Sequence, residues 1–220
     1  MRVTLITFSY NGSRWPATVV LRDRLAMYVP DHFKVSEEDE IFAFIDANAF
    51  GQLISMDAGR PYASHLPFLI AEDHKTIQCH LARQNPQWQQ LADQQVLITF
   101  LGPHDYISPS WYENPGVPTW NYQAVHIYGH CQVLDDDAAV AKIVEALSAR
   151  YESGFESPWQ PQYREAMLKA IIGVEITIDE VQCKYKLSQN RPKADHQGVV
   201  DQLEKMGSKP LAKVMRKTLL

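Results

Sequence analysis

The sequence lacks any run that approaches the roughly 20 apolar residues of a membrane-spanning helix. It has only 3 cysteines in 220 residues, an odd and widely spaced set that argues against a disulfide framework and suits a reducing cytoplasm. Positive charge is also scarce, because the formal net charge is -5. The surface as a whole therefore does not attract nucleic acid or anionic lipid. We expect a soluble, cytoplasmic protein without a membrane partner.

Several chemical motifs are missing as well. Neither a GxGxxG nor a P-loop glycine pattern occurs, so a nucleotide cofactor would have to be held in another way. No serine lies in a glycine-framed nucleophile elbow, and covalent catalysis is not expected. His126 and His130 lie four residues apart on a predicted strand without an evident acidic third ligand, so no metal site is predicted.

The most informative stretch present runs from Tyr106 to His130. It holds two tryptophans, four tyrosines, three prolines and two histidines. The prolines fix the backbone and remove amide donors, which predicts a rigid loop over residues 110–119. Apolar and polar residues then alternate from Trp120 to Leu134, as in a strand with one polar face. So many rings favour a site for a flat ligand; the alternative is that they are core or interface residues.

The rest of the chain predicts short strands and a few helices. Strands are expected at residues 51–56, 62–70, 76–81, 96–101, 174–178 and 181–187, the first three as an antiparallel meander. Helices are expected from a cap at Ser36 to Asn48, after residues 135–137, over residues 162–172 with Gly173 as the stop, and from about Asp195. This pattern favours a mainly β protein, a small antiparallel barrel with peripheral helices, over a doubly wound sheet.

The two ends of the chain differ from its middle. Residues 1–26 carry four arginines against one aspartate, and we expect them to be an upstream extension, with Met27 as the biological start. Residues 27–192 are expected to form the barrel domain and residues 193–220 a C-terminal helical segment. The last residues carry a basic series, which is either a solvated helix face or the best local candidate for contact with DNA: Lys205, Lys209, Lys213, Arg216 and Lys217.

Arg83 is a candidate phosphate ligand. It follows a predicted strand and precedes Asn85-Pro86, which opens a helix. A guanidinium beside the amides of a helix start can bind a phosphate. The alternative is that Arg83 is an ordinary surface cation.

Four groups of residues resemble the PaiB family of FMN-binding proteins, in order along residues 27 to about 190. They are His80-Leu81-Ala82-Arg83 with Asn85-Pro86-Gln87-Trp88, Gly102-Pro103-His104 with Tyr106-Ile107-Ser108-Pro109-Ser110-Trp111-Tyr112, Val117-Pro118-Thr119-Trp120-Asn121-Tyr122, and Lys186-Leu187-Ser188-Gln189-Asn190-Arg191. The resemblance implies an FMN-binding split barrel, similar to flavin reductases and pyridoxamine-phosphate oxidases, whose two subunits build each FMN site at a dimer interface.

The resemblance also implies a set of site residues. Arg83 would hold the FMN phosphate, and His80 with the Ser64-His65 pair would lie along the same cofactor. A second group would come from the partner subunit: Lys186, Ser188, Gln189, Asn190 and Arg191. Further residues would wall the flavin ring or meet the other subunit: Trp111, Trp120, Asn121 and Tyr122.

Three functions follow as alternatives. The family is described as negative transcriptional regulators, so the first is an FMN-binding homodimer that alters transcription directly on DNA or through a regulatory protein partner. The second is a flavin-dependent oxidoreductase that uses NAD(P)H, in which the cofactor does the hydride chemistry. The third is a split barrel that binds haem or another planar ligand. The residues assign no acid–base pair to a substrate, so enzymatic activity stays open.

Overall fold

The computed structural model describes residues 27–92, 94–160 and 165–219. Its strands are β1 (Phe50–Asp57), β2 (Arg60–Pro67), β3 (Leu69–Ile70), β4 (Thr76–Ala82), β5 (Gln95–Ile107), β6 (Thr119–Leu134) and β7 (Ile171–Lys186). Its helices are α1 (Glu38–Ala47), α2 (Asp137–Glu152), α3 (Glu165–Leu168), α4 (Lys193–Lys205) and α5 (Lys209–Lys217), with short 3-10 helices η2 (Asp31–Phe33), η3 (Pro86–Gln90) and η4 (Pro109–Trp111). None of the helices in these ranges is long and apolar enough to cross a membrane.

All strands belong to one antiparallel sheet of 7 strands in the order β2-β1-β5-β6-β7-β4-β3. Only Phe68 separates β2 from β3 in the chain, yet these strands lie at the two ends of that order. The sheet therefore has to curl until its edges approach each other, which closes a barrel except at this split. The predicted mainly β split barrel with peripheral helices is confirmed.

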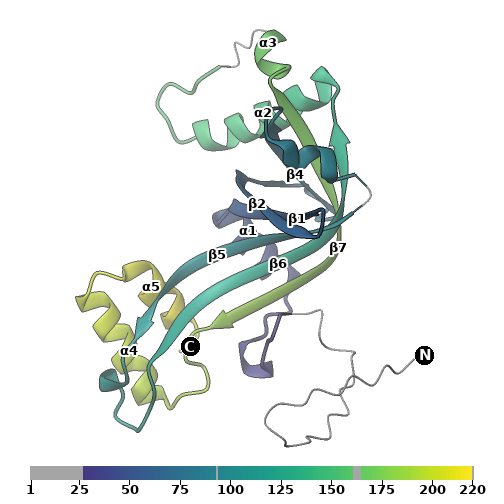
Figure 1. The fold of residues 1–220 in the computed structure, drawn as a ribbon. Coiled ribbons are helices and arrows are strands. Elements are labelled where there is room, and N and C mark those ends of the chain that lie inside the picture. Colours follow the sequence, from purple (N-terminus) through teal and green to yellow (C-terminus); the bar gives the residue numbers. More distant parts are fainter. Residues whose placement is uncertain (1–26, 93, 161–164, 220) are drawn as a thin grey trace, which may run out of the picture.

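Three strands leave the barrel and form an arm. β5, β6 and β7 run together past the barrel, and the arm carries α4 and α5 at its end (Figure 1). We call residues 101–107, 119–124 and 184–187 the arm. α2 and α3 lie at the opposite end of the molecule (Figure 1). The molecule thus has two distant ends, one with α4 and α5 and one with α2 and α3, and long strands join them.

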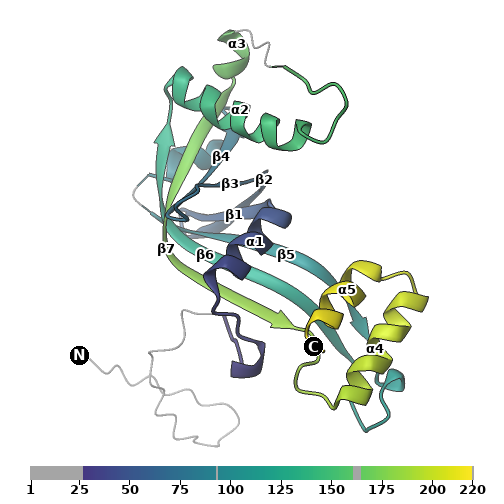
Figure 2. The ribbon, with the colours of Figure 1, turned by 180° about the vertical axis from the view of Figure 1, so that it is seen from behind.

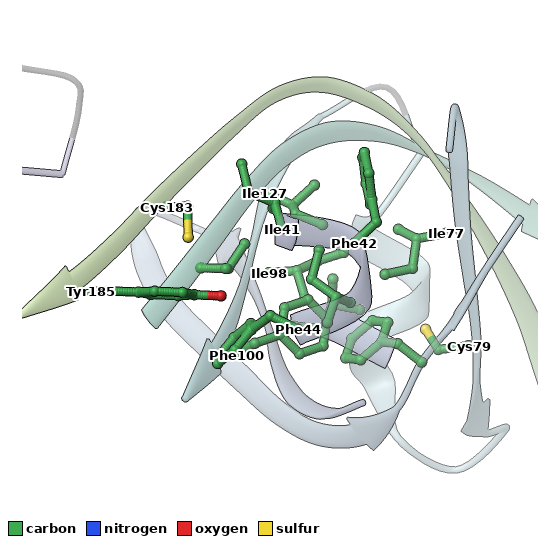
Figure 3. Close-up of a cluster of buried hydrophobic side chains, with 14 of the residues drawn as sticks. Ile41, Phe42, Phe44, Ile77, Cys79, Ile98, Phe100, Ile127, Cys183 and Tyr185 are labelled. Atoms are coloured by element: carbon green, nitrogen blue, oxygen red, sulfur yellow. The ribbon is translucent and has the colours of Figure 1, made fainter. Parts of the chain in front are cut away.

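The core fills the barrel under α1. The helix lays Ile41, Phe44 and Ile45 against the inner face of the sheet, where Ile98 and Phe100 are fully buried (Figure 3). Each such side chain contributes about 1.5–3 kcal/mol through burial. α1 ends at Asn48, as predicted, but its N-cap is Glu37 rather than Ser36, and no side chain caps it. α1 and α5 lie on the same side of β5 (Figure 2).

The predicted meander is confirmed in its two antiparallel pairings, β1 with β2 and β3 with β4, but it is wrong in its continuous middle strand. The expected strand over residues 62–70 breaks at the buried Phe68, and its two parts pair on different edges of the sheet. The reason is that the chain crosses the split of the barrel at Phe68, whose ring packs against Phe100 at a centroid distance of 5.4 Å. A continuous apolar run shows no sign of such a crossing.

The predicted helix over residues 162–172 is also wrong at its C-terminal end. Only Glu165–Leu168 is helical among the described residues, and residues 161–164 lie outside them. Gly173 does not stop a helix but lies inside β7, opposite His80. A Cβ there would lie 3.0 Å from Cδ1 of Ile143, so the glycine lets α2 pack closely on the sheet.

Three further boundaries differ from the predictions. β5 continues through a bulge to Ile107, and the two predicted strands after residue 174 are one strand with a bulge near Ile178. The C-terminal segment forms two helices because Gly207 turns the chain at φ +87. The predicted extension over residues 1–26 lies outside the described residues.

Candidate functional site

The predicted site residues fall into two clusters in one chain. The barrel cluster is Ser64, His65, His80 and Arg83; the arm cluster is Trp111, Trp120, Asn121, Lys186, Ser188, Gln189, Asn190 and Arg191. Arg83 N–H donates to the carbonyl of Ala170, just before β7 begins, whereas Lys186 is the last residue of β7. A strand of this length follows a path of about 50 Å. One chain alone does not bring the clusters together.

The barrel cluster is built around the start of η3. Asn85 caps this short helix, because its side-chain oxygen accepts a hydrogen bond from the Gln87 amide. The Asn85 Nδ2 donates to Ser64 Oγ at 2.9 Å, which ties β2 to the helix start. His65, the next residue, points to the other side of β2, where its Nε2 lies 3.0 Å from Gln52 Nε2 and its ring stacks on Phe50.

His80 has an unpaired polar atom in this cluster. It lies on β4, on the face opposite the core residues Cys79 and Leu81. Its Nδ1 is buried and makes no hydrogen bond within the described residues. Burial lowers the pKa of His80, so the ring is neutral at physiological pH. A neutral imidazole with an unpaired nitrogen can accept or donate one hydrogen bond to a ligand.

Arg83 is held by an ion pair. Its Nη2 donates to Asp135 Oδ1 at 2.5 Å, and its Nε donates to the carbonyl of Lys169 at 2.6 Å. The hydrogen bond to Asp135 raises the pKa of Arg83 and lowers that of Asp135. No local pattern in the sequence indicated this partner, which lies 52 positions away. A phosphate at Arg83 would share the guanidinium with Asp135 or displace it.

Part of the arm cluster is buried. Asn121 is fully buried, and its Nδ2 donates to Ser188 Oγ at 2.9 Å and to Met215 Sδ at 3.4 Å. Ser188 is also buried and adopts a φ of 68, in the left-handed region that a serine rarely occupies. These two residues fasten the turn after β7 to β6 and α5.

The next residues of the arm cluster also hold this turn. Lys186 Nζ donates to Thr119 Oγ1 at 2.5 Å and to the Trp120 carbonyl at 2.6 Å. Gln189 Nε2 donates to the Tyr185 carbonyl at 2.6 Å, while its Oε1 accepts from an amide two residues earlier. Burial, with Lys184 nearby, lowers the pKa of Lys186. Asn190 lies at the exposed tip of the turn.

Asp195 of α4 holds the aromatic loop, residues 108–118, in place, although its residue type and spacing did not predict this role. Asp195 is fully buried, and its Oδ1 accepts hydrogen bonds from the amides of Glu113 at 2.9 Å and Asn114 at 3.1 Å. Burial alone would raise the pKa of Asp195, but these bonds, a side-chain bond from Asn114 and the charge of Arg191 lower it overall. An aspartate in the first turn of a helix is common, so nothing in the sequence marked it as buried.

Trp111 lies in the same loop. It is partly buried against the core, and α4 approaches its main chain so closely that a Cβ at Gly198 would lie 2.6 Å from the Trp111 carbonyl oxygen. Trp111 therefore lies beside α4, and its side chain stays partly exposed.

The surface of the arm that faces away from α1 and α5 is rich in exposed apolar side chains. Leu101, Tyr106 and Trp120 are 54%, 41% and 53% exposed, and Phe50 of β1 is 65% exposed. Tyr106 pairs with Trp120 across β5 and β6, with ring centroids 6.4 Å apart. We call this surface the outer face. Contiguous apolar surface of this kind marks an interaction site.

The outer face extends across neighbouring strands to His65 of the barrel cluster. His65 pairs with Gln52, which pairs with Thr99, which pairs with His126, so these residues form one row across four strands. Burial lowers the pKa of His126, which makes this ring neutral too. One end of the row carries the predicted cofactor residue His65. In the part of the chain that the structure describes, no group of three His, Cys, Asp or Glu side chains could hold a metal ion.

The donors of the two clusters fit the chemistry of FMN. Its phosphate is an anion, for which Arg83 supplies positive charge and Ser64 a hydroxyl. The buried, unpaired Nδ1 of His80 offers a further hydrogen bond. Trp120, on the outer face, offers an exposed ring surface for a flat isoalloxazine.

Comparison with known proteins identifies the family to which this chain is similar. Residues 27–180 match a family described as "Putative FMN-binding domain". Over 204 residues, the chain is 41% identical to the "Protease synthase and sporulation protein PAI 2" of Bacillus subtilis (strain 168), a match that covers 88% of this chain and 98% of that protein.

Two solved structures share the fold. The flavocytochrome Anf3 of Azotobacter vinelandii matches with a TM-score of 0.56 and 18% identity, over 70% of this chain and 69% of that one. The FAD and heme binding protein of Mycobacterium smegmatis matches with a TM-score of 0.58 and 15% identity, over 70% and 73%. At these identities, the likeness establishes the split-barrel fold alone.

Proposed function

The chain belongs to the PaiB family of FMN-binding proteins, and from this premise we propose that it is a homodimer with two shared FMN sites. Each site joins the barrel cluster of one subunit to the arm cluster of the other. The observation that carries this proposal is the position of the two clusters at opposite ends of β7. A two-fold axis brings such ends together twice, and so builds two equivalent sites.

The outer face supports a dimer. Its exposed Leu101, Tyr106 and Trp120 would be buried if the arm of one subunit lay on the barrel of the other. Aromatic side chains are the commonest anchors of such interfaces. The row from His65 to His126 lies on the same face, so the partner would cover a surface that already leads to the cofactor residues.

Within each site, some residues contact FMN and others hold the contacting residues in place. Arg83, Ser64 and His80 hold the phosphate end. Trp120 and the exposed Asn190 of the partner's arm cluster lie along the ring, and the half-buried Arg191 adds positive charge beside them. Asn121, Ser188, Lys186 and Gln189 support these contacts, because their hydrogen bonds fix the turn after β7. FMN supplies the redox chemistry of such a site when it is bound. The protein orients the cofactor and excludes water.

We propose a negative regulatory role in transcription as the function of this flavoprotein. It is what the family resemblance implies, and the C-terminal helices offer a surface for it. α5 buries Leu211 and Met215 and exposes Lys209, Lys213 and Lys217. Direct contact with DNA would use this basic face, and the affinity would fall steeply with salt because counterions are released. A DNA affinity that does not respond to salt would argue against direct contact.

An absorbance spectrum of the purified protein, recorded with and without added FMN and combined with its mass in solution, tests the core of the proposal. We expect a flavin spectrum with one FMN per subunit and twice the mass of the 25.1 kDa chain. A monomer that binds FMN fully would show that one chain suffices, and a protein that ignores FMN would remove the proposed site.

A further inference from the structure

A cavity lies on the side of the arm opposite the outer face. It is a groove of about 430 Å³ between α1, α5 and the inner face of the arm strands. Phe44 of α1 and Tyr185 of β7 form an aromatic part of its wall, with ring centroids 5.5 Å apart, and Val214 of α5 adds an aliphatic part. Figure 3 shows Tyr185 reaching toward Phe44 at the edge of the core. A groove of this size suits a small organic molecule.

The groove is separate from the proposed flavin site. Gln123 of β6 and Tyr185 of β7 are paired in the sheet and both line the groove. Their neighbours Tyr122 and Lys186 are also paired, and they point to the outer face, because successive residues of a strand alternate between faces. The arm sheet therefore lies between the groove and the surface proposed for FMN and the partner subunit.

Gln123 gives the groove an unpaired polar group. Its side chain is only 6% exposed and makes no hydrogen bond to any residue that the structure describes. Its amide atoms are not among the solvent-inaccessible unpaired atoms of the described residues, so they keep contact with solvent in the groove. The amide is therefore free to form a hydrogen bond with a ligand oxygen there.

The charges at the rim indicate the polarity of the ligand. Lys213 and Lys217 stand one turn apart on α5 and line the groove, and neither forms an ion pair within the described residues. The acidic group on the groove is Glu40, on α1. A carboxylate would therefore be attracted to the α5 side, where two cations face it, and repelled from Glu40.

We propose that this groove binds a small amphipathic carboxylate, distinct from the flavin, with its apolar body on Phe44, Tyr185 and Val214. The carboxylate lies at the α5 wall, where the lysines supply charge and the Gln123 amide donates a hydrogen bond. Because α1 packs in the barrel and α5 on the arm, such a ligand joins the two parts of the chain. It would act as an effector that the flavin proposal does not include.

The test uses the full-length protein loaded with FMN and titrated with decanoate below its micellar concentration. Calorimetry and thermal unfolding are measured together with the flavin spectrum. We expect one decanoate per subunit, a higher melting temperature and unchanged flavin occupancy. Decyltrimethylammonium has the same chain and the opposite charge, and it is expected to give neither heat nor a shift.

Variants then locate the binding site. The double change Lys213→Met and Lys217→Met removes two exposed charges without disturbing the core, and should weaken decanoate binding about tenfold or more. Gln123→Leu should weaken it as well. Lys209→Met is the matched control, because Lys209 lies on the same helix but does not line the groove.

Four outcomes would overturn the proposal. They are no binding of decanoate, equal binding of the cationic analogue, an equal loss of binding in Lys209→Met, and release of FMN as decanoate binds. The last outcome would place the ligand in the flavin site. A protein that holds FMN as a dimer but does not bind decanoate would refute this inference and leave the flavin proposal intact.

Discussion

The guanidinium of Arg191 lies over the ring of Tyr112, with 4.1 Å from its Cζ to the ring centroid. Arg191 also donates to the carbonyl of Pro115 at 3.0 Å, and Gly116 leaves room for it, since a Cβ there would lie 2.4 Å from Arg191 Nη2. The aromatic loop is thus wrapped around a side chain that follows β7. Two parts of the arm cluster, distant in the sequence, depend on each other.

Replacing Arg191 with lysine should loosen this loop. Lysine keeps the charge but loses the planar stacking and the fork of donors, so we expect a loss of about 1 kcal/mol in the free energy of unfolding. FMN retention should fall with it. Urea unfolding measures the first effect and the flavin spectrum the second. Arg60→Lys, at the exposed start of β2, is the control and should change neither; equal behaviour of the two variants would contradict the proposed clamp.

Asp195 predicts a pH dependence of stability. Its pKa in the folded protein is lowered, so its ionised form stabilises the fold above the unfolded value of about 3.9. This stabilisation is lost as the pH falls through the lower, folded value. Asp195→Asn should therefore be less stable than the parent at pH 7, and the difference should shrink below roughly pH 4.

Urea unfolding at a series of pH values checks this prediction. Asp201→Asn is the control, because Asp201 lies on the same helix and is exposed. It should show no comparable pH-dependent difference from the parent. A constant gap between Asp195→Asn and the parent at all pH values would mean that the ionisation of Asp195 does not contribute.

The role of Arg83 can be separated from its ion pair. Arg83→Ala should weaken FMN binding roughly tenfold or more, because a charged contact to the phosphate is lost. Asp135→Asn removes the competing carboxylate and leaves Arg83 bonded only to main-chain carbonyls, so it should bind FMN at least as tightly as the parent. Fluorescence titration of the apoprotein with FMN measures both. If both variants bind equally poorly, the ion pair is structural and Arg83 is not a phosphate ligand.

The outer face predicts the oligomeric state. Trp120→Glu places a charge in the proposed interface, which should weaken the dimer about a hundredfold or more, since a buried charge would have no partner. Light scattering over a range of concentrations shows the shift to monomer. Met206→Glu is the control, because Met206 is similarly exposed but lies between α4 and α5. A dimer that survives in Trp120→Glu would place the interface elsewhere.

The sequence predicted local features better than long-range ones. Alternation located β6, because Val125 and Ile127 face the core while His126 does not, and the Asn85 cap and the Asn48 helix end are local signals too. The crossing at Phe68 could not be predicted, since a buried residue between two strands looks the same whether the chain continues or changes edge. Family motifs, rather than periodicity, identified the cofactor.

The site was predicted as a set of residues but not as an arrangement. Asp135 and Asp195 each meet their hydrogen-bond partners only through the tertiary fold, across 52 and more positions, so neither spacing nor residue type revealed these bonds. The same holds for Asn121 and Ser188, whose types suit a ligand contact although both are buried and bonded to each other. Burial is a property of the whole fold, which a local pattern does not contain.

Sharing of each FMN site between subunits predicts complementation. Arg83→Ala damages the barrel cluster and Lys186→Ala the arm cluster, so each homodimer should bind FMN poorly. When the two variants are unfolded together and refolded, about half of the dimers contain one chain of each kind. Such a dimer has one site with both defects and one with none. About a quarter of all sites should then bind FMN with the parent affinity. If the clusters acted within one chain, every site would keep one defect and mixing would restore nothing, which is the result that would refute the shared site.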